Sequence, residues 1–351
     1  MNVLILTDKL IMGGAEMYFC KLENYLNHPG LTFYYAAGTG DLYKKIKNKQ
    51  HFIELSRSNH LQNLKRLISL IHDKNISVIH ANSLRMVMYS TCVKKMIHRP
   101  LKIVYTKHNV TILERKVPNL FRYLLNKHVD RIITVSDFEK ENLEEAGIDQ
   151  NKIKTIYNGV DLEQFLFELK EKRKMFHIGI LARLSEEKNH ELFIDIADHL
   201  RDRPNILFHI AGDGPEKQRI ADQIKARNLT DKVKMLGEVQ NPETFIKEMD
   251  VLLLTSYREV FPMVIIESMA VGTPIISINQ GGIKEAVIDG ETGFLIKSHS
   301  TTDFCKQILR LESDHRQRLQ LIERARGKVE KDFSLNQMIH QTLKEYLNCS
   351  Q

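Results

Sequence analysis

The feature that most constrains the fold of this sequence is an alternation of short apolar runs with stretches of helical periodicity, which starts twice. In the first half, the runs that predict strands lie at 2–7, 31–37, 77–81, 102–106 and 131–135. A second series begins after 174, with runs at 176–182, 206–211, 233–236, 251–255 and 274–278. Stretches with helical spacing, such as 61–72, separate the runs. This alternation indicates βαβ units and parallel sheets.

The repeated series predicts two domains of one fold class, α/β with a doubly wound, Rossmann-like parallel sheet. A length of 351 residues fits two domains at about 100–200 residues each. A charged stretch at 168–174 has little pattern and separates the series. We therefore expect one domain over 1–165 and a second over 175–332.

Composition and cysteine usage indicate an ordinary protein of a reducing compartment. The chain opens on a short apolar run without a preceding basic segment, and no run is long enough for a membrane span. The four cysteines show neither C-x-x-C spacing nor histidines at zinc-ligand intervals: Cys20, Cys92, Cys305 and Cys349. We expect a cytoplasmic protein without a structural metal.

The net charge of +7 is concentrated in the first half of the chain. Residues 1–165 carry 24 basic and 16 acidic side chains, whereas 166–351 carry 27 and 28. Residues 84–131 alone hold 11 basic and two acidic side chains. No helix-turn-helix, RRM or zinc-finger pattern accompanies them, which argues against nucleic acid. The surplus indicates either a solvated face or contact with an anionic membrane surface.

Within this basic stretch, 110–128 combines apolar and basic residues at helical spacing. The apolar stripe comprises Leu120, Phe121, Leu124 and Leu125, and its flanks carry Arg115, Lys116, Arg122 and Lys127. The pattern fits either a core-facing helix with a solvated basic side or a helix that rests on anionic lipid.

The segment 251–272 carries the strongest indication of a binding site. Its first four residues predict a buried strand, and Pro262 predicts the first position of the next helix. The free amides of 263–265 would then face the carboxyl edge of the sheet, where a helix N-terminus favours an anion. Glu259 and Glu267 flank this site and can accept hydrogen bonds from sugar hydroxyls. The alternative is an ordinary strand-loop-helix with two solvated glutamates.

Two cations follow the first strand of the second series. Arg183 and Lys188 lie five residues apart at the edge where ligands bind in doubly wound sheets. An arginine fork and a lysine point charge together suit a diphosphate, although a solvated surface pair is the alternative. The turns at 211–215 and at Gly281-Gly282 expose backbone at the same edge, and we expect a helix from Ile283.

The first half offers two further candidates at its predicted sheet edge. The turn Gly13-Gly14 lacks G-x-G-x-x-G spacing, but two glycines let the backbone approach a phosphate or sugar. A plain helix-entry turn is the alternative. His108 follows the strand 102–106, where it is either a sugar-pocket residue or a structural hydrogen-bonding group.

Five segments together resemble family 4 of the retaining GT-B glycosyltransferases. They are G-G-A-E, A-R-L-S-x-E-K-N, A-G-D-G-P, E-V-F-P-x-V-x-x-E-S-M-A-x-G-x-P and G-G-I-x-E, in the order and spacing of that family. The likeness covers nearly the whole chain, and Ser268 stands where alanine is commoner. It implies a GT-B fold of two domains facing across a cleft. The first would bind the acceptor and the second the donor, and the C-terminal helix 333–351 would pack back on the first domain.

The resemblance also implies roles for individual residues. Arg183 and Lys188 would hold the donor diphosphate, Glu259 would contact the donor sugar, Glu267 the ribose, and His108 would line the sugar pocket. Of these, His108, Arg183, Lys188 and Glu259 form the implied catalytic set. The implied donor site is completed by Gly13, Gly14, Phe261, Pro262, Met263 and Val264.

The implied reaction moves a hexosyl group from a nucleotide-diphosphate sugar, with a UDP-sugar favoured, to a hydroxyl acceptor with retention of configuration. The acceptor would be a saccharide or lipid-linked saccharide in bacterial surface polysaccharide or glycolipid assembly, with the enzyme peripheral at the inner face of the cell membrane. The sequence has no D-x-D motif, so we expect no metal and no cofactor. A sugar-nucleotide epimerase of the same fold and a non-catalytic GT-B partner subunit are the alternatives.

Overall fold

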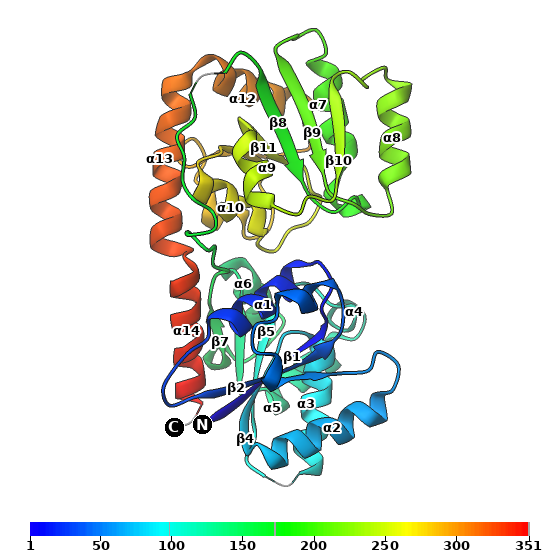
Figure 1. Ribbon diagram of the computed structural model, residues 1–351, viewed down its shortest axis with the longest axis vertical. Coiled ribbons are helices and arrows are strands. Elements are labelled where there is room, and N and C mark those ends of the chain that lie inside the picture. The colour runs from blue at the N-terminus through cyan, green and yellow to red at the C-terminus, as the bar shows by residue number, and fades with distance from the viewer. Residues whose placement is uncertain (98, 172, 350–351) are drawn as a thin grey trace. The chain divides into compact units, whose positions relative to one another are not determined.

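The computed structural model describes residues 1–97, 99–171 and 173–349, which form two compact units (Figure 1). The first unit comprises Met1–Asn158 together with Asn336–Gln351, and the second comprises Gly159–Leu335. Each is a parallel sheet flanked by helices, so the predicted fold class is confirmed. The first unit ends at Asn158 rather than at the expected 165, and the second spans Gly159–Leu335 rather than the expected 175–332.

The first unit contains a seven-stranded parallel sheet in the order β3-β2-β1-β4-β5-β6-β7. Its strands are β1 (Asn2–Lys9), β2 (Thr32–Gly38), β3 (Phe52–Glu54), β4 (Ile76–Ala81), β5 (Lys102–Lys107), β6 (Arg131–Thr134) and β7 (Ile153–Thr155). Its helices are α1 (Gly14–Tyr25), α2 (His60–Asp73), α3 (Leu84–Met96), α4 (Ile112–Lys116), α5 (Pro118–His128), α6 (Asp137–Glu145) and α14 (Leu335–Asn348). Short 3-10 turns are η1 (Asp41–Lys45), η2 (Lys49–His51) and η3 (Gln150–Lys152).

Helices cover both faces of the first sheet. One face packs apolar side chains of β1, β4 and β5 against α2, α3 and α5, with Leu67, Val87 and Phe121 in that core. On the other face, Phe19 of α1 packs edge-on against Tyr35 of β2. Tyr346 of α14 is fully buried there, and its hydroxyl lies 2.5 Å from Nδ1 of His80.

The second unit contains a six-stranded parallel sheet in the order β10-β9-β8-β11-β12-β13. Its strands are β8 (Phe176–Leu181), β9 (Ile206–Ala211), β10 (Val233–Gly237), β11 (Val251–Leu254), β12 (Ile275–Ile278) and β13 (Phe294–Ile296). Its helices are α7 (His190–His199), α8 (Lys217–Ala226), α9 (Pro242–Glu248), α10 (Met263–Val271), α11 (Ile283–Ala286), α12 (Thr301–Ser313) and α13 (His315–Asp332), with a 3-10 turn η4 (Glu186–Lys188).

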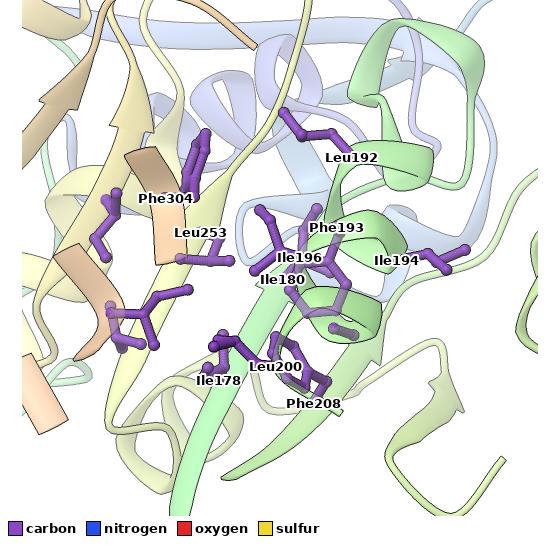
Figure 2. Close-up of a cluster of buried hydrophobic side chains, with 14 of the residues drawn as sticks. Ile178, Ile180, Leu192, Phe193, Ile194, Ile196, Leu200, Phe208, Leu253 and Phe304 are labelled. Atoms are coloured by element: carbon purple, nitrogen blue, oxygen red, sulfur yellow. The ribbon is translucent and has the colours of Figure 1, made fainter. Parts of the chain in front are cut away.

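The core of the second unit lies between this sheet and the helices α7, α8 and α12. Figure 2 shows Phe193 of α7 beside Ile180 of β8, with Phe208 of β9 nearby. The rings of Phe193 and Phe208 meet edge to face at 5.5 Å. Because both sheet faces are covered, β11 is entirely apolar and buried, as its sequence predicts.

The predicted elements differ from the structure at three edge strands and at one helix. The strands β3, β7 and β13 were missed because three residues are too few to show a periodic pattern. The stretch 110–128 forms two helices, since Pro118 begins a new one. Phe121 and Leu125 are buried, but Leu120 is 50% exposed, so the predicted apolar stripe is wrong at that residue.

Candidate functional site

The carboxyl edge of the second sheet gathers four of the five motif segments. They follow β8, β9, β11 and β12, and these four strands are neighbours in the sheet. The strand order therefore brings together loops that are up to about a hundred residues apart in the chain. Ligands of doubly wound sheets bind at this edge.

Lys188 and Glu259 meet at this edge. The Nζ atom of Lys188 lies 2.7 Å from Oε1 of Glu259, and the lysine is 23% and the glutamate 9% exposed. The loop after β8 is also tied to β11 through its backbone, because the Thr255 hydroxyl donates to the Lys188 carbonyl at 3.0 Å. The two predicted site residues are thus brought into direct contact from different loops.

Arg183 lies in the same loop but in a different environment. It is exposed and sits two residues beyond the end of β8, whereas the sequence had indicated a cation directly ending a buried strand. Burial alone would raise the pKa of the nearby Glu187 carboxyl, but hydrogen bonds and the charges of Lys188 and Arg183 lower it overall. Arg183 therefore adds positive potential to this loop while its guanidinium stays accessible.

The N-terminus of α10 lies in the loop that carries Glu259. The helix begins at Met263 with Pro262 as its N-cap, so the prediction of Pro262 as the first helical residue is one position early. The Ile265 amide donates to the Pro262 carbonyl at 3.2 Å, which leaves the amides of Met263 and Val264 for an anion rather than the three expected. Glu267 lies one turn into α10 and is half-buried.

Phe261 packs its side chain into the second unit beneath the surface of this loop. Its side chain is 6% exposed, and its ring lies 5.4 Å from the ring of Phe333. This packing indicates that Phe261 supports the loop from within the unit, and its place in the donor site stays a prediction.

Glycines allow the neighbouring loops to pack closely. A Cβ at Gly281, whose φ is +57°, would lie 1.9 Å from the carbonyl oxygen of Glu259, and the Gly282 amide donates to the Val260 carbonyl at 2.8 Å. A Cβ at Gly212 would lie 2.0 Å from the Ala182 carbonyl. The glycine-containing loops therefore hold the backbones around Glu259 and Arg183 in place.

In the first unit, Gly13 caps α1 and Gly14 begins it, as expected from a helix-entry turn. The side chain of Glu16 folds over this turn, since a Cβ at Gly13 would lie 2.4 Å from the Glu16 Oε2 atom. Burial raises the pKa of the Glu16 carboxyl. A phosphate that approached the Gly14 amide would compete with this carboxylate.

His108 follows β5 and has the features of a site residue. Its ring lies 4.8 Å from that of Tyr18, and its Nε2 atom is buried without a hydrogen-bond partner in the described part of the chain. Burial lowers the pKa of His108 to about 3, so the ring is neutral at pH 7. A neutral imidazole can hydrogen-bond to a sugar hydroxyl without adding charge beside an anomeric carbon.

Two other polar residues near this edge carry no sequence signal. Lys107 has no exposed surface and pairs with buried Glu139 and, at 3.0 Å, with Glu114. Asn82, directly after β4, is 2% exposed, and both polar atoms of its side chain lack partners among the described residues. Only their burial in the folded unit distinguishes them from other polar residues, because neither belongs to a recognisable motif.

Within residues 1–97, 99–171 and 173–349, no group of three or more His, Cys, Asp or Glu side chains is placed to hold a metal ion. In the same residues, no helix combines the length and apolar character needed to cross a membrane.

Comparison with known proteins decides the family. Residues 12–164 match the model described as Glycosyltransferase Family 4, and residues 162–328 match the model of Glycosyl transferases group 1. The two matches together span residues 12–328. The chain belongs to the family 4 glycosyltransferases.

Relatives of this glycosyltransferase carry different names. It is 27% identical to the N-acetyl-alpha-D-glucosaminyl L-malate synthase of Bacillus anthracis, over 79% of this chain and 76% of that one. It is 24% identical to the capsular polysaccharide biosynthesis glycosyltransferase CapM of Staphylococcus aureus, over 92% and 91%. It is 27% identical to the UDP-Gal:alpha-D-GlcNAc-diphosphoundecaprenol alpha-1,3-galactosyltransferase of Escherichia coli, over 72% of each chain.

Solved structures share the fold of this glycosyltransferase. Anabaena Alr3699/HepE in complex with UDP matches with a TM-score of 0.86 and 20% identity, over 99% of this chain and 100% of that one. A glycosyltransferase from Rickettsia africae ESF-5 matches with a TM-score of 0.88 and 22% identity, over 100% and 98%. At these identities the likeness shows the GT-B fold alone, and the roles of individual residues stay predictions.

Proposed function

We propose that this glycosyltransferase moves a hexosyl group from a UDP-sugar to a hydroxyl of a saccharide or lipid-linked saccharide, with retention at the anomeric carbon and without a metal. The observation that carries the proposal is the contact of Lys188 with Glu259 beside the N-terminus of α10. A cation, helix amides and a carboxylate together match a diphosphate joined to a sugar.

Charge explains how these groups would act. Breaking the bond between sugar and diphosphate leaves negative charge on the β-phosphate and positive character at the anomeric carbon. Lys188, Arg183 and the amides of Met263 and Val264 would stabilise the leaving diphosphate by fixed electrostatics. Lys188 has three N–H donors, so it can keep Glu259 oriented toward the sugar while it also binds phosphate.

The choice of donor and reaction course rests on relatives and motifs. One relative is named for UDP-galactose, and HepE was solved with UDP and with UDP-glucose. Retention follows from the family resemblance, and no separate general base is apparent, so the leaving phosphate would accept the acceptor's proton. The lack of a D-x-D motif together with the cations at 183 and 188 supports catalysis without a metal.

The donor half of the proposal is tested with UDP-sugars. Folded protein should show a higher melting temperature with UDP than with other nucleoside diphosphates, since a ligand of the folded state alone stabilises it. UDP-sugars without acceptor should be hydrolysed slowly, and interconversion to an epimer would instead favour the epimerase. Excess EDTA should leave the rate unchanged, and NMR of the product should show retained anomeric configuration.

Replacing Lys188 tests the site itself. Lys188→Ala should lower donor turnover by about 10²–10³, because one preorganised electrostatic donor is lost. Lys225→Ala removes an exposed charge from α8 in the same unit and should leave turnover at the wild-type rate. Equal turnover in Lys188→Ala and wild type would point to a non-catalytic subunit and contradict the assignment.

We also propose that the enzyme is peripheral to an anionic membrane through the surface of α4 and α5. Large apolar side chains are exposed there at Val110, Ile112, Val117, Leu120 and Tyr123. Arg115, Lys116, Arg122 and Lys127 are exposed on the same short segment. Exposed apolar residues among cations suit headgroups and the acyl boundary together.

The membrane proposal predicts co-sedimentation with vesicles that contain phosphatidylglycerol, weakening as salt rises. Ile112→Gln should reduce binding, whereas Leu236→Gln, which changes an exposed leucine of the second unit, should not. If no protein sediments with these vesicles at low ionic strength, the acceptor is reached from solution and this proposal fails.

A further inference from the structure

An open hollow of about 600 Å³ lies in the first unit, beside the carboxyl ends of β2 and β3. Polar side chains dominate its lining, notably Thr39, Glu54, Ser56, Arg57, Gln62 and Arg66. None of them belongs to the five motif segments or to the proposed donor site. A hollow of this size, built mostly from polar groups, suits part of a saccharide rather than an apolar ligand.

Two arginines in the lining, Arg57 and Arg66, form no ion pair with a carboxylate among the described residues. The Nη2 atom of Arg57 donates to the Thr39 carbonyl at 2.6 Å, and Nη1 of Arg66 donates to the Glu54 carbonyl at 2.8 Å. Backbone carbonyls thus orient both forks and leave their remaining donors for a ligand.

The only carboxylate in the lining, among the described residues, is that of Glu54. Its Oε1 atom accepts a hydrogen bond from the Thr39 hydroxyl at 3.1 Å, which holds it on the wall of the hollow. Two guanidinium groups against one carboxylate leave one positive charge. The balance favours an anionic ligand over a neutral sugar.

The segment that carries Arg57 is held rigidly. Asn63, which is 3% exposed, accepts from the Ser56 amide at 2.8 Å and donates to the Ser56 carbonyl at 2.7 Å. The Ser56 hydroxyl accepts from the Asn59 amide at 3.0 Å, and Asn59 in turn caps α2. A preorganised segment loses little entropy on binding, and the positive end of this 14-residue helix adds to the potential.

The strand order places the hollow relative to His108. The sheet runs β3-β2-β1-β4-β5, so β2 lies three spacings from β5, or about 14 Å at roughly 4.8 Å per spacing. The Leu10 amide donates to the Gly38 carbonyl at 2.9 Å, which ties the segment beside the hollow to the one that leads into Gly13-Gly14. The hollow therefore shares the edge of His108 but lies too far away to hold the sugar that reacts there.

We propose that this hollow binds an oxyanion carried by the acceptor, at a point remote from the reacting hydroxyl. That the ligand is an acceptor rests on the function proposed above. The substrate class is then an acidic saccharide, and its oxyanion is either the carboxylate of a uronic acid or a phosphate that links the saccharide to its carrier. An arginine fork binds either group through paired hydrogen bonds.

The test measures binding to the full chain with UDP at saturation, so that the nucleotide site is occupied. The probes are sodium glucuronate, inorganic pyrophosphate and glucose. The binding of each is measured by NMR or calorimetry. At least one of the two anions should bind with one-to-one stoichiometry, and its binding should weaken as the salt concentration rises. Glucose should not bind comparably. The anion that binds identifies carboxylate or phosphate as the group recognised.

Variants localise the binding. Arg57→Gln and Arg66→Gln should each weaken it about tenfold, since each removes charge-assisted hydrogen bonds. Both side chains are exposed, so the fold should survive, which the melting temperature checks. Lys65→Gln removes a charge from an exposed position of α2 outside the lining and should bind as wild type does. Arg57→Lys should retain part of the affinity.

If neither anion binds, or if both arginine variants bind the anion as tightly as wild type does, the proposal is overturned. Hydrolysis of a UDP-sugar without acceptor is measured separately on the same variants and should match wild type. If the wild-type protein turns over no UDP-sugar, the proposed function is contradicted. Arginine-dependent binding of the probes, measured apart from turnover, decides whether the hollow is an anion site.

Discussion

Lys107 shows how burial gives a single charged side chain a structural role. Its ammonium has no exposed surface and pairs with Glu139 of α6 and Glu114 of α4. A charge buried without a partner is strongly unfavourable, so these pairs tie both helices to the end of β5. The loop that carries His108 starts at the next residue and is held by the same contacts.

Lys107→Met should therefore lower the free energy of unfolding by about 3–5 kcal/mol, because two carboxylates lose their buried partner. Urea denaturation followed by circular dichroism measures this. Lys140→Met removes a lysine from an exposed i,i+4 pair with Glu144 and should cost about 0.5 kcal/mol or less. Adding Glu139→Gln to Lys107→Met should recover part of the loss, and equal costs for the two single variants would contradict this account.

A contact between two loops of the second unit positions Glu259. Gly281 has φ of +57°, and a Cβ there would meet the Glu259 carbonyl at 1.9 Å. Gly290 has φ of +75°, yet a Cβ there would meet nothing within 4 Å. The two glycines share the left-handed backbone conformation and differ only in what they touch.

Gly281→Ala should displace the Glu259 loop and lower kcat/KM for the UDP-sugar at least about tenfold, as small misplacements of site groups do. Gly290→Ala should cost about 1 kcal/mol of stability from the same backbone strain and leave turnover unchanged. Steady-state kinetics with thermal unfolding of both variants separate the two effects. A similar loss of turnover in Gly290→Ala would show that backbone strain alone is responsible.

A second element, α14, is attached to the first unit by a buried polar chain. The Tyr346 hydroxyl bonds to His80, whose Nε2 atom lies 2.6 Å from the Thr106 hydroxyl. Burial lowers the pKa of His80 to about 3, so the ring is neutral and can take part as both donor and acceptor. This chain gives α14 a specific register that apolar packing alone would leave less defined.

Tyr346→Phe should reduce the free energy of unfolding by about 1–3 kcal/mol, since it leaves His80 Nδ1 buried without its partner. The matched change Tyr123→Phe removes an exposed hydroxyl from α5 and should have little effect. Urea unfolding of the two variants gives the comparison. Equal stability of Tyr346→Phe and wild type would mean that the buried bond contributes nothing net.

Both units of the protein bury neutral histidines. Burial lowers the pKa of His80 and His108 to about 3 in the first unit, and that of His190 and His209 to about 4 in the second. The ordinary value in an unfolded chain is about 6.5. Between these values the unfolded chain binds more protons than the folded one.

The free energy of unfolding should therefore fall as the pH is lowered from about 6.5 toward 4, and should be independent of these groups above pH 7.5. Urea midpoints across this range measure the slope. His190→Leu should reduce this slope with pH, whereas His199→Gln, at an exposed position, should leave the slope unchanged. A midpoint that stays constant or rises on acidification would contradict the burial of neutral histidines.

Much of this architecture could be predicted from the sequence. The restart of the strand pattern at Phe176 predicted a second sheet, and apolar runs marked ten strands within a residue or two. The motif segments indicated Lys188, Glu259 and the helix that follows Pro262. These features are local, because a periodic run or a glycine turn is determined by residues that are neighbours in the chain.

Other features depended on which distant segments the fold brings together. Lys188 and Glu259 are 71 residues apart, and their 2.7 Å contact exists because β8 and β11 are adjacent strands. The burial of Lys107 and Asn82 likewise follows from strand order and side-chain packing. So does the position of the two arginines of the hollow, which pair with no carboxylate among the described residues. The sequence was sufficient to predict the fold class, the family and the chemistry available at the sheet edges. Which charges are paired, buried or left for a ligand became known from the folded chain, because burial and pairing depend on neighbours in space.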